Sequence, residues 1–253
     1  MRLNLPPTIC FRITRVCNAH CGFCLAPPDG THPTTETLAH RLDWLLSRGV
    51  KTIHFCGGEP TIHPGLLPLL AHVDACGGNT KLTTNAIAIS DAMLPVLRSI
   101  GTRVKVSLHD DHEQHDRILG RPAFDLTTGN IRRLIAAGIS TSIQTTVVTG
   151  GMEVVDWVAE FCLHLGIRRL SILPVIPRGR GYGQSGEYEL SVQQRGALRE
   201  FVARKRRALN GRLDVRWLGF TSRPIHVVES DGRVILEGRA ESMDEVLCQI
   251  PAV

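Results

Sequence analysis

The chain has 253 residues, of which 43% are hydrophobic, and this is enough to bury one large core or one core with a small appendage. The net charge of +5 is mild, only four of the 29 basic residues are lysines, and no basic stripe stands out, so a nucleic-acid partner is not expected. No apolar run approaches the roughly 20 residues of a membrane span, and the N-terminus lacks the apolar run of a signal peptide, so we expect a cytoplasmic protein without a membrane partner. Eight cysteines in that reducing compartment indicate metal binding or chemistry rather than disulfides.

Apolar periodicity switches repeatedly between strand-like and helix-like segments along most of the chain. In chain order, we expect a strand at Thr8–Ile13, a helix from Thr34 or Thr35 to about Gly49, a strand at Lys51–Cys56, a helix near Gly65–Ala75, a strand at Lys81–Thr84 and a helix near Asp91–Ser99. The pattern continues with a strand at Arg103–Leu108, a helix at about Leu126–Ala137, a strand at Thr141–Val148, a helix at Val154–Leu165 and a strand at Arg169–Leu173.

Six strand–helix units predict a parallel sheet with right-handed crossovers, and six are too few for a full eight-stranded barrel. We therefore expect an α/β fold, a partial (β/α)6 TIM-type barrel, over residues 1–183. Beyond Gly183 the pattern changes to a helix at Val192–Ala208 and short strands at Asp214–Leu218, Ile225–Val228 and Val234–Leu236. Because Asp231-Gly232 between apolar runs is a hairpin signal, residues 184–253 are expected to form a small extension of helix and β-hairpin.

The strongest chemical signal is a cysteine triplet directly after the first strand, Cys17-Asn-Ala-His-Cys21-Gly-Phe-Cys24. Three thiolates on one loop can ligate three irons of one cubane cluster, and thiolates also suit zinc. Three protein ligands would leave one iron open, as in a reaction site rather than a closed electron carrier. On spacing alone, a zinc site completed by His20 or another histidine is an open alternative.

The triplet resembles the C-x3-C-x2-C motif of the radical S-adenosylmethionine (SAM) superfamily, with an aromatic residue before its last cysteine. Gly57-Gly58-Glu59-Pro60 after the second strand resembles the GGEP segment that contacts the amino group of SAM. Thr83-Thr84-Asn85 after the third strand resembles the threonine-asparagine-glycine segment, although Ala86 replaces the usual glycine. Matches in the same order along the chain favour an iron–sulfur cluster over zinc.

The resemblance implies that Cys17, Cys21 and Cys24 hold one [4Fe–4S] cluster and that SAM binds beside it. The residues expected to contact SAM are Phe23, Gly57, Gly58, Glu59, Thr84, Asn85, Ser107, His109 and Thr145. It further implies an electron donor such as flavodoxin or ferredoxin, reductive cleavage of SAM, and a 5′-deoxyadenosyl radical that abstracts hydrogen from an organic substrate. No residue is indicated as the catalytic group of the later steps, and Cys56 is interpreted as a buried strand residue rather than a further ligand.

The C-terminal part resembles the SPASM and molybdopterin-cyclase branches of the superfamily. Residues 174–181 resemble their P-x-GR-type segment, and residues 224–234 resemble the SPASM hairpin without its flanking cysteines. We therefore expect a degenerate SPASM-like tail that lacks an auxiliary cluster. Arg178 and Arg180 would emerge beside the cofactor, where guanidinium groups can hold a substrate carboxylate or phosphate, the other interpretation being a solvated loop pair.

Three functions remain open. The SPASM-like tail favours a radical SAM enzyme acting on a peptide or natural-product precursor. The early first strand, which leaves no room for a leader-recognition domain, makes a small metabolite or nucleotide an alternative substrate. The alternative of another class is a non-catalytic iron–sulfur or zinc-binding module, which would not need Glu59 or Asn85.

Overall fold

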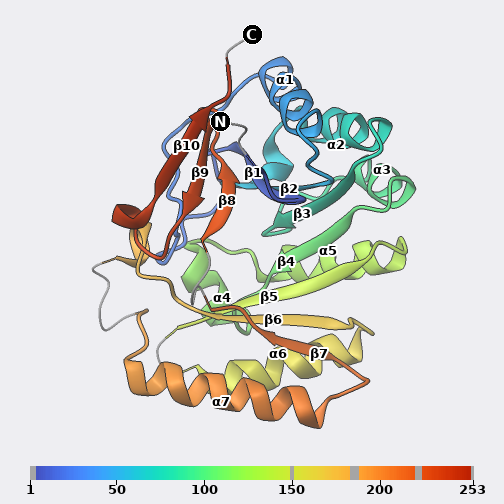
Figure 1. The fold of residues 1–253 in the computed structure, drawn as a ribbon. Helices are drawn as coiled ribbons and strands as arrows, with labels where there is room; N and C mark the ends of the chain where they lie inside the picture. The colour runs from blue at the N-terminus through green and yellow to red at the C-terminus, as the bar shows by residue number, and fades with distance from the viewer. Residues whose placement is uncertain (1–3, 149–150, 183–187, 220–223, 252–253) are drawn as a thin grey trace.

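One curved sheet of ten strands organises the computed structural model, which describes residues 4–148, 151–182, 188–219 and 224–251 (Figure 1). The strand order is β10-β9-β8-β1-β2-β3-β4-β5-β6-β7, so β7 and β10 form the two edges of an open sheet. Strands β1 to β7 are parallel neighbours in chain order, β8 lies parallel to β1, and β8–β9–β10 form an antiparallel meander. The predicted α/β partial barrel is confirmed.

Apart from α4, the strands and helices of the barrel core agree closely with the predicted ranges. They are β1 (Thr8–Thr14), α1 (Thr35–Leu46), β2 (Thr52–Gly57), the 3-10 turn η1 (Pro60–Ile62), α2 (Leu66–Ala75), β3 (Asn79–Thr84), α3 (Met93–Ser99), β4 (Arg103–Ser107), α4 (His112–Leu119), α5 (Phe124–Ala136), β5 (Thr141–Val147), α6 (Met152–His164) and β6 (Arg169–Pro174). They are followed by η2 (Gly179–Gly181), α7 (Val192–Ala208), β7 (Asp214–Trp217), β8 (Ile225–Val228), β9 (Arg233–Glu237), η3 (Glu241–Met243) and β10 (Glu245–Gln249).

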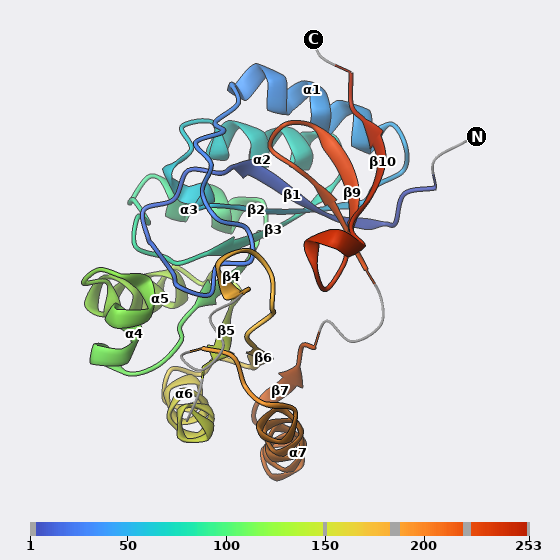
Figure 2. The same ribbon diagram turned by 90° about the vertical axis from the view of Figure 1, so that its left-hand side faces the viewer.

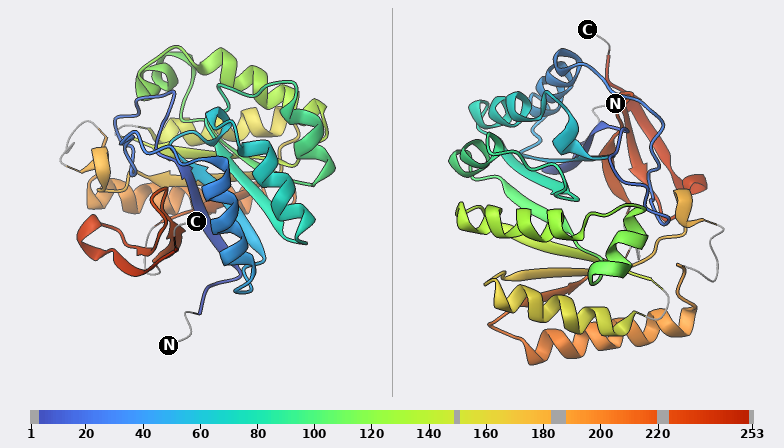
Figure 3. Two further views of the ribbon diagram at one scale, coloured as in Figure 1. Left: turned by 90° about the horizontal axis from the view of Figure 1, so that it is seen from above. Right: turned by 180° about the vertical axis from the view of Figure 1, so that it is seen from behind.

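The helices cover the outer, convex face of the sheet, and the strand residues that alternate toward them form the main core (Figures 2 and 3). Along β1 the buried outward positions are Ile9, Phe11 and Ile13, and along β2 they are Ile53 and Phe55. The intervening residues point to the concave face, because successive side chains of a strand alternate between faces. The concave face is therefore free of the core and can carry polar side chains.

Two elements were not predicted. Helix α4 has only two apolar residues, Ile118 and Leu119, so its sequence lacks the periodicity that indicates a helix. Strand β10 is short and largely exposed, and it forms by pairing with β9 rather than by burying an apolar face. Both elements depend on tertiary contacts that local sequence does not contain.

The C-terminal extension completes the sheet at both edges. Helix α7 leads to β7, which pairs with β6, and the β8–β10 meander joins the opposite edge beside β1. The boundary near residue 183 stays a prediction, since that position lies outside the described residues. Among the helices that the structure describes, none combines the length and apolar character needed to cross a bilayer.

Candidate functional site

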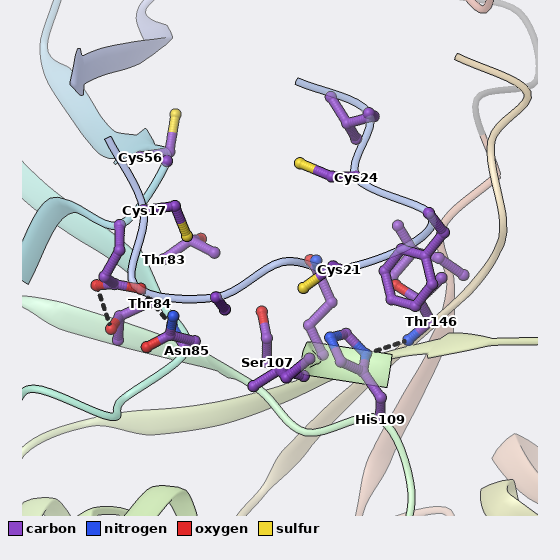
Figure 4. Close-up of a pocket in the computed structure, with 18 of the residues that line it drawn as sticks. Cys17, Cys21, Cys24, Cys56, Thr83, Thr84, Asn85, Ser107, His109 and Thr146 are labelled. Atoms are coloured by element: carbon purple, nitrogen blue, oxygen red, sulfur yellow. Dashed lines mark hydrogen bonds between the residues drawn. The ribbon is translucent and has the colours of Figure 1, made fainter. Parts of the chain in front are cut away.

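A cavity opens at the carboxyl ends of the parallel strands, where ligands bind in open α/β sheets (Figure 4). Its volume is about 190 Å³. Most of the residues singled out from the sequence line it together: Cys17, Cys21, Phe23, Cys24, Gly57, Gly58, Glu59, Thr84, Asn85, Ser107 and His109. Thr145, Arg178 and Arg180 are not among its lining residues.

The cysteine loop, residues 15–34 between β1 and α1, turns three thiols toward this cavity. The half-buried side chains of Cys17, Cys21 and Cys24 surround one space in Figure 4. Burial raises the pKa of Cys17 to about 11 and that of Cys21 to about 12, and the negative charge of neighbouring groups adds to both shifts. Without metal these thiols stay protonated, so iron binding would displace their protons. Three sulfur ligands on one loop fit a [4Fe–4S] cluster with one iron left open.

Two glycines at the end of β2, Gly57 and Gly58, let the cysteine loop lie directly against the sheet edge. Gly57 has φ +145°, and a Cβ there would lie 2.3 Å from the carbonyl oxygen of Thr14. A Cβ on Gly58 would lie 2.1 Å from the carbonyl oxygen of Val16. The backbones instead join through hydrogen bonds from Gly58 N to Thr14 O (2.7 Å) and from Glu59 N to Val16 O (2.9 Å). The glycine pair thus fixes the start of the cysteine loop, in addition to the contact with SAM that is expected from the sequence.

Three further hydrogen bonds hold the same loop to segments that follow other strands and helices of the fold. The Asn85 side chain donates to Asn18 Oδ1 (2.7 Å), and Arg121 donates to the Asn18 carbonyl oxygen (2.8 Å). The Arg180 backbone N–H donates to the Cys24 carbonyl oxygen (2.9 Å). The loop is therefore anchored to the ends of β3, α4 and β6 as well as β2, and its thiols are held in place before any metal binds.

Glu59 is buried, and its carboxylate accepts hydrogen bonds from η1 and from the end of β3. Its Oε1 accepts from Thr61 N (3.0 Å), Thr61 Oγ1 (2.6 Å) and Thr84 Oγ1 (2.7 Å), and its Oε2 accepts from Asn85 N (2.7 Å). Burial raises the pKa of Glu59, while these hydrogen bonds act against that shift. Among the described residues Oε2 accepts one bond, so it keeps capacity for a cationic ligand group.

The family profile of the Radical SAM superfamily matches residues 11–162, from β1 to α6, and includes the three cysteines, the glycine pair and Asn85. The chain belongs to the radical SAM superfamily. The cofactors of this superfamily are a [4Fe–4S] cluster and SAM, in agreement with the sequence-based expectation, and its members are enzymes.

The most similar curated proteins include an AdoMet-dependent heme synthase of Methanosarcina barkeri, 29% identical over 70% of this chain and 53% of that protein. They also include a PqqA peptide cyclase of Ruegeria pomeroyi, 26% identical over 84% of this chain and 59% of that protein. The chain spans about half the length of the curated relatives it matches. These relatives agree with the branch of the superfamily that the sequence resembles.

The fold is similar to that of solved radical SAM proteins. Streptococcus suis SuiB bound to its precursor peptide SuiA superposes with a TM-score of 0.79 over 92% of this chain and 59% of SuiB, at 19% identity. SuiB bound to S-adenosylmethionine gives a TM-score of 0.76 over 91% of this chain and 60% of SuiB, also at 19% identity. At such low identity these matches establish the partial-barrel fold and no more.

The turn Thr84-Asn85-Ala86 at the end of β3 contains a backbone conformation that is uncommon for alanine. Ala86 has φ 57°, the one non-glycine residue with positive φ in the described chain, and it stands where the superfamily usually has glycine. Its N–H donates to Thr84 Oγ1 (2.8 Å), and its carbonyl oxygen accepts from Asn130 (2.7 Å). These contacts hold the turn although alanine costs roughly 1–2 kcal/mol there relative to glycine.

His109 is a buried, neutral donor at the cavity wall of this radical SAM site. Its Nδ1 accepts from Thr146 N (3.2 Å), so a neutral ring carries its proton on Nε2. Burial lowers the pKa of His109 to about 3, with the nearby His115 adding to the shift. Its ring packs edge-on against Phe23, with centroids 5.0 Å apart, so the two predicted residues form one wall.

The predicted role of Thr145 does not match its position. Thr145 is fully buried toward the helices, and its hydroxyl donates to the Leu108 carbonyl oxygen (2.7 Å). Its neighbours Gln144 and Thr146 line the cavity instead. The alternation on β5 explains the difference, because Ile143 shares the outward face with Thr145.

The predicted substrate role of Arg178 is likewise corrected. Arg178 is buried and makes a bidentate pair with Asp244, with N–O distances of 2.7 and 2.6 Å. This pair joins the loop after β6 to the segment before β10 and engages both terminal nitrogens of the guanidinium, while Nε is buried away from the cavity. Arg180 donates its backbone N–H to the cysteine loop, and its positive charge acts against the burial that raises the pKa of Cys21, so it lies close to the cluster ligands.

Cys56 also differs from its interpretation as a core residue. Its side chain lies on the concave face of β2 and lines the cavity next to the glycine pair (Figure 4). It is half-buried, and its pKa is raised through its hydrogen bond with Cys10 and through burial. The strand alternation that buries Phe55 on the outward face could have indicated this position from the sequence.

Proposed function

We propose that this chain carries the active site of a radical SAM enzyme that modifies a peptide or natural-product precursor. The supporting observation is that three thiols, the glycine pair, Glu59 and His109 share one cavity, which opens into the interior of the partial barrel. When bound, a reduced [4Fe–4S] cluster supplies the electron that cleaves SAM and generates a 5′-deoxyadenosyl radical for hydrogen abstraction. The protein would supply the rest: it would bind and orient SAM and the substrate, and it would exclude water from the cavity.

The side chains support this division of roles. Cys17, Cys21 and Cys24 would hold the cluster. The free capacity of Glu59 Oε2 suits the ammonium of SAM in a charge-assisted hydrogen bond. His109, with its proton on Nε2, can donate to a polar group of SAM or substrate, and the apolar face of Phe23 suits adenine while excluding water.

A peptide substrate is favoured by the relatives. A PqqA peptide cyclase and a SuiB structure with a precursor peptide are among them, and each shares most of this chain's length. An organic molecule other than a peptide is the second candidate, because an AdoMet-dependent heme synthase and a probable GTP 3′,8-cyclase of Sulfurisphaera tokodaii are similar to a comparable degree.

A non-catalytic iron–sulfur or zinc module explains less of the structure. Such a module needs the three cysteines, but it gives no reason for a buried carboxylate and a neutral histidine in the same cavity. We further propose that the enzyme acts in the reducing cytoplasm, where its eight free thiols are stable and a flavodoxin or ferredoxin can supply electrons.

The test is anaerobic reconstitution with iron and sulfide, reduction with dithionite, addition of SAM, and detection of 5′-deoxyadenosine by chromatography. Cys24→Ala should abolish the product because it removes a cluster ligand. Cys76→Ala is the matched control, since Cys76 is exposed and outside the cavity. A reconstituted protein that binds no SAM and forms no 5′-deoxyadenosine would contradict the proposal.

A further inference from the structure

The interior of the partial barrel continues from the cofactor cavity toward the amino ends of the strands. This interior, here called the lumen, has a volume of about 560 Å³ and shares Cys24, Cys56, Gly57, Thr83, Gln144 and Leu173 with the cofactor cavity. This volume lies within the roughly 300–1,000 Å³ of a typical small-molecule site and adds to the cofactor cavity, so there is room for a substrate beside SAM. Its walls are the concave faces of the strands.

The amino end of the lumen is strongly basic. A hollow there is lined by five cations from β3, β4, β6 and β7, namely Lys81, Arg103, Lys105, Arg169 and Arg216. It shares His54, Lys105 and Leu218 with the lumen, so the basic group lies at the far end of the same continuous space. Lys81 and Lys105 are half-buried, whereas the three arginines are exposed at the rim.

These lysines lack a carboxylate partner within the described residues. Burial lowers the pKa of Lys105, the neighbouring Lys81 and Arg169 lower it further, and the acidic groups that act on it are the thiols of Cys10 and Cys56. Burial also lowers the pKa of Lys81, with Arg103 and Arg169 adding to the shift. Like charges gathered in a concave, partly dry site create a strong positive potential.

Asp214 is a carboxylate that pairs with cations of the hollow, and its partners are two of the rim arginines. It accepts from Arg216 Nε (2.6 Å) and lies 3.5 Å from Arg169 Nε. One carboxylate against five cations leaves the hollow positive. The lysines deeper inside gain nothing from this pair, because Asp214 is absent from the charges that shift the pKa of either lysine.

We propose that Lys81, Lys105 and Arg169 form a binding site for an anionic group of the substrate, either a carboxylate or a phosphate. The inference rests on the proposed function, since it assigns the substrate's position in the lumen of that enzyme. Lys105 lies two residues before Ser107 of the cofactor cavity, a distance of about 7 Å along a strand. A substrate held by its anionic group at this end can extend the reacting carbon toward the cofactor.

The chain offers a direct test because it has only four lysines. The purified protein is acylated with a trace of a small amine-reactive reagent, and the labelling of each lysine is quantified by mass spectrometry. Inorganic phosphate and succinate serve as separate probes, at ionic strength held constant with chloride. We expect saturable protection of Lys81 and Lys105, while Lys51 and Lys205, which lie outside the hollow, report any general change in reactivity.

The two probes distinguish the sources of the anion. Stronger protection by phosphate assigns a phosphorylated substrate, and stronger protection by succinate assigns a carboxylate such as an acidic peptide side chain. Protection of neither lysine, or an equal change at all four, overturns the site. That result with intact formation of 5′-deoxyadenosine would leave the proposed function standing, and the converse result would leave the anion site standing.

A variant provides the second measurement. Lys105→Met keeps the length of the side chain and removes its charge, and it should weaken binding of the protecting anion about tenfold, as expected for the loss of one charge-assisted contact. Lys205→Met is the matched control, because Lys205 pairs with Asp156 on the surface. Equal affinity of both variants for the anion, measured by calorimetry, would contradict the assignment of Lys105.

Discussion

Cations at the two ends of the lumen have opposite electrostatic surroundings. At the carboxyl end, Arg12 of β1 pairs with Glu229 and Glu237, and Arg178 pairs with Asp244, so each guanidinium faces at least one carboxylate. At the amino end, Lys81 and Lys105 lie among other cations, and no described carboxylate acts on them. Both groups come from inward positions of the same sheet or from the loops that cover it.

This difference separates a structural role from a binding role. The paired arginines join the C-terminal meander to β1 and to the loop after β6, and thereby hold the segments that surround the cysteine loop. Breaking a buried pair leaves an uncompensated charge, whereas removing an unpaired cation relieves repulsion. The two ends should therefore respond with opposite signs to the loss of a positive charge.

The largest effect is expected at the glycine pair of the carboxyl end. Gly58→Ala places a methyl group against the Val16 backbone, so the cysteine loop must shift away from β2. We expect a loss of cluster iron and at least about a hundredfold loss in 5′-deoxyadenosine formation, as a misplacement of about 1 Å can cause. Gly129→Ala in α5 is the control, since nothing lies within 4 Å of its added Cβ. Normal iron content in Gly58→Ala would show that the loop does not depend on this approach.

The next largest effect is on stability. Arg12→Met should lower the free energy of unfolding by about 3–5 kcal/mol, because the buried Glu229 and Glu237 lose their nearest cation. The cations that remain are more distant, Arg15 at 3.3 Å from Glu229 and Arg178 at 3.8 Å from Glu237. Urea denaturation measures the change. A loss below about 1 kcal/mol would place this group with ordinary surface pairs and remove the contrast between the two ends.

A smaller effect depends on pH. The fully buried His115 has its pKa lowered to about 4 by burial, against an unfolded value of about 6.5. A base with a depressed folded pKa contributes stability above the unfolded pKa and loses it as pH falls toward the folded one. Between pH 7.5 and 5 this amounts to about 2 kcal/mol, since each unit is worth about 1.4 kcal/mol. His115→Gln should flatten this part of the stability profile, and an unchanged slope would assign the acid sensitivity elsewhere.

The smallest effect reverses the sign. Lys105→Met should leave the free energy of unfolding unchanged or raise it by up to about 1 kcal/mol at low ionic strength, because repulsion from Lys81 and Arg169 is removed. Added salt should reduce the gain by screening the same repulsion. A destabilisation of several kcal/mol would mean that Lys105 has a structural partner and would break the comparison.

The sequence alone predicted those features whose residues lie close together along the chain. The spacing of Cys17, Cys21 and Cys24 and the glycine pair Gly57-Gly58 indicated the cysteine loop and its cavity, and apolar periodicity predicted the six strand–helix units. The pairing of Arg178 with Asp244 joins residues far apart in sequence, so no local pattern could predict it. Thr145 is a different case, because the apolar Ile143 and Val147 on the same face already indicated that it points away from the cavity.

The sequence could predict only part of the basic group at the amino end of the lumen. Lys81 and Lys105 alternate with the buried Leu82 and Val104, which predicts that both lysines point to the concave face. Their convergence with Arg169 depends on the register of β3 to β6, and that register is set by the pairing of successive strands rather than by any one strand.

Electron paramagnetic resonance of the reconstituted, dithionite-reduced protein tests the central claim most directly, with spectra recorded before and after addition of SAM. If Cys17, Cys21 and Cys24 hold a [4Fe–4S] cluster with one iron open to SAM beside Glu59, the reduced protein gives a [4Fe–4S]⁺ signal whose g-values shift when SAM is added. A signal that SAM leaves unchanged, or the absence of any cluster signal in protein that retains its fold, would contradict the account.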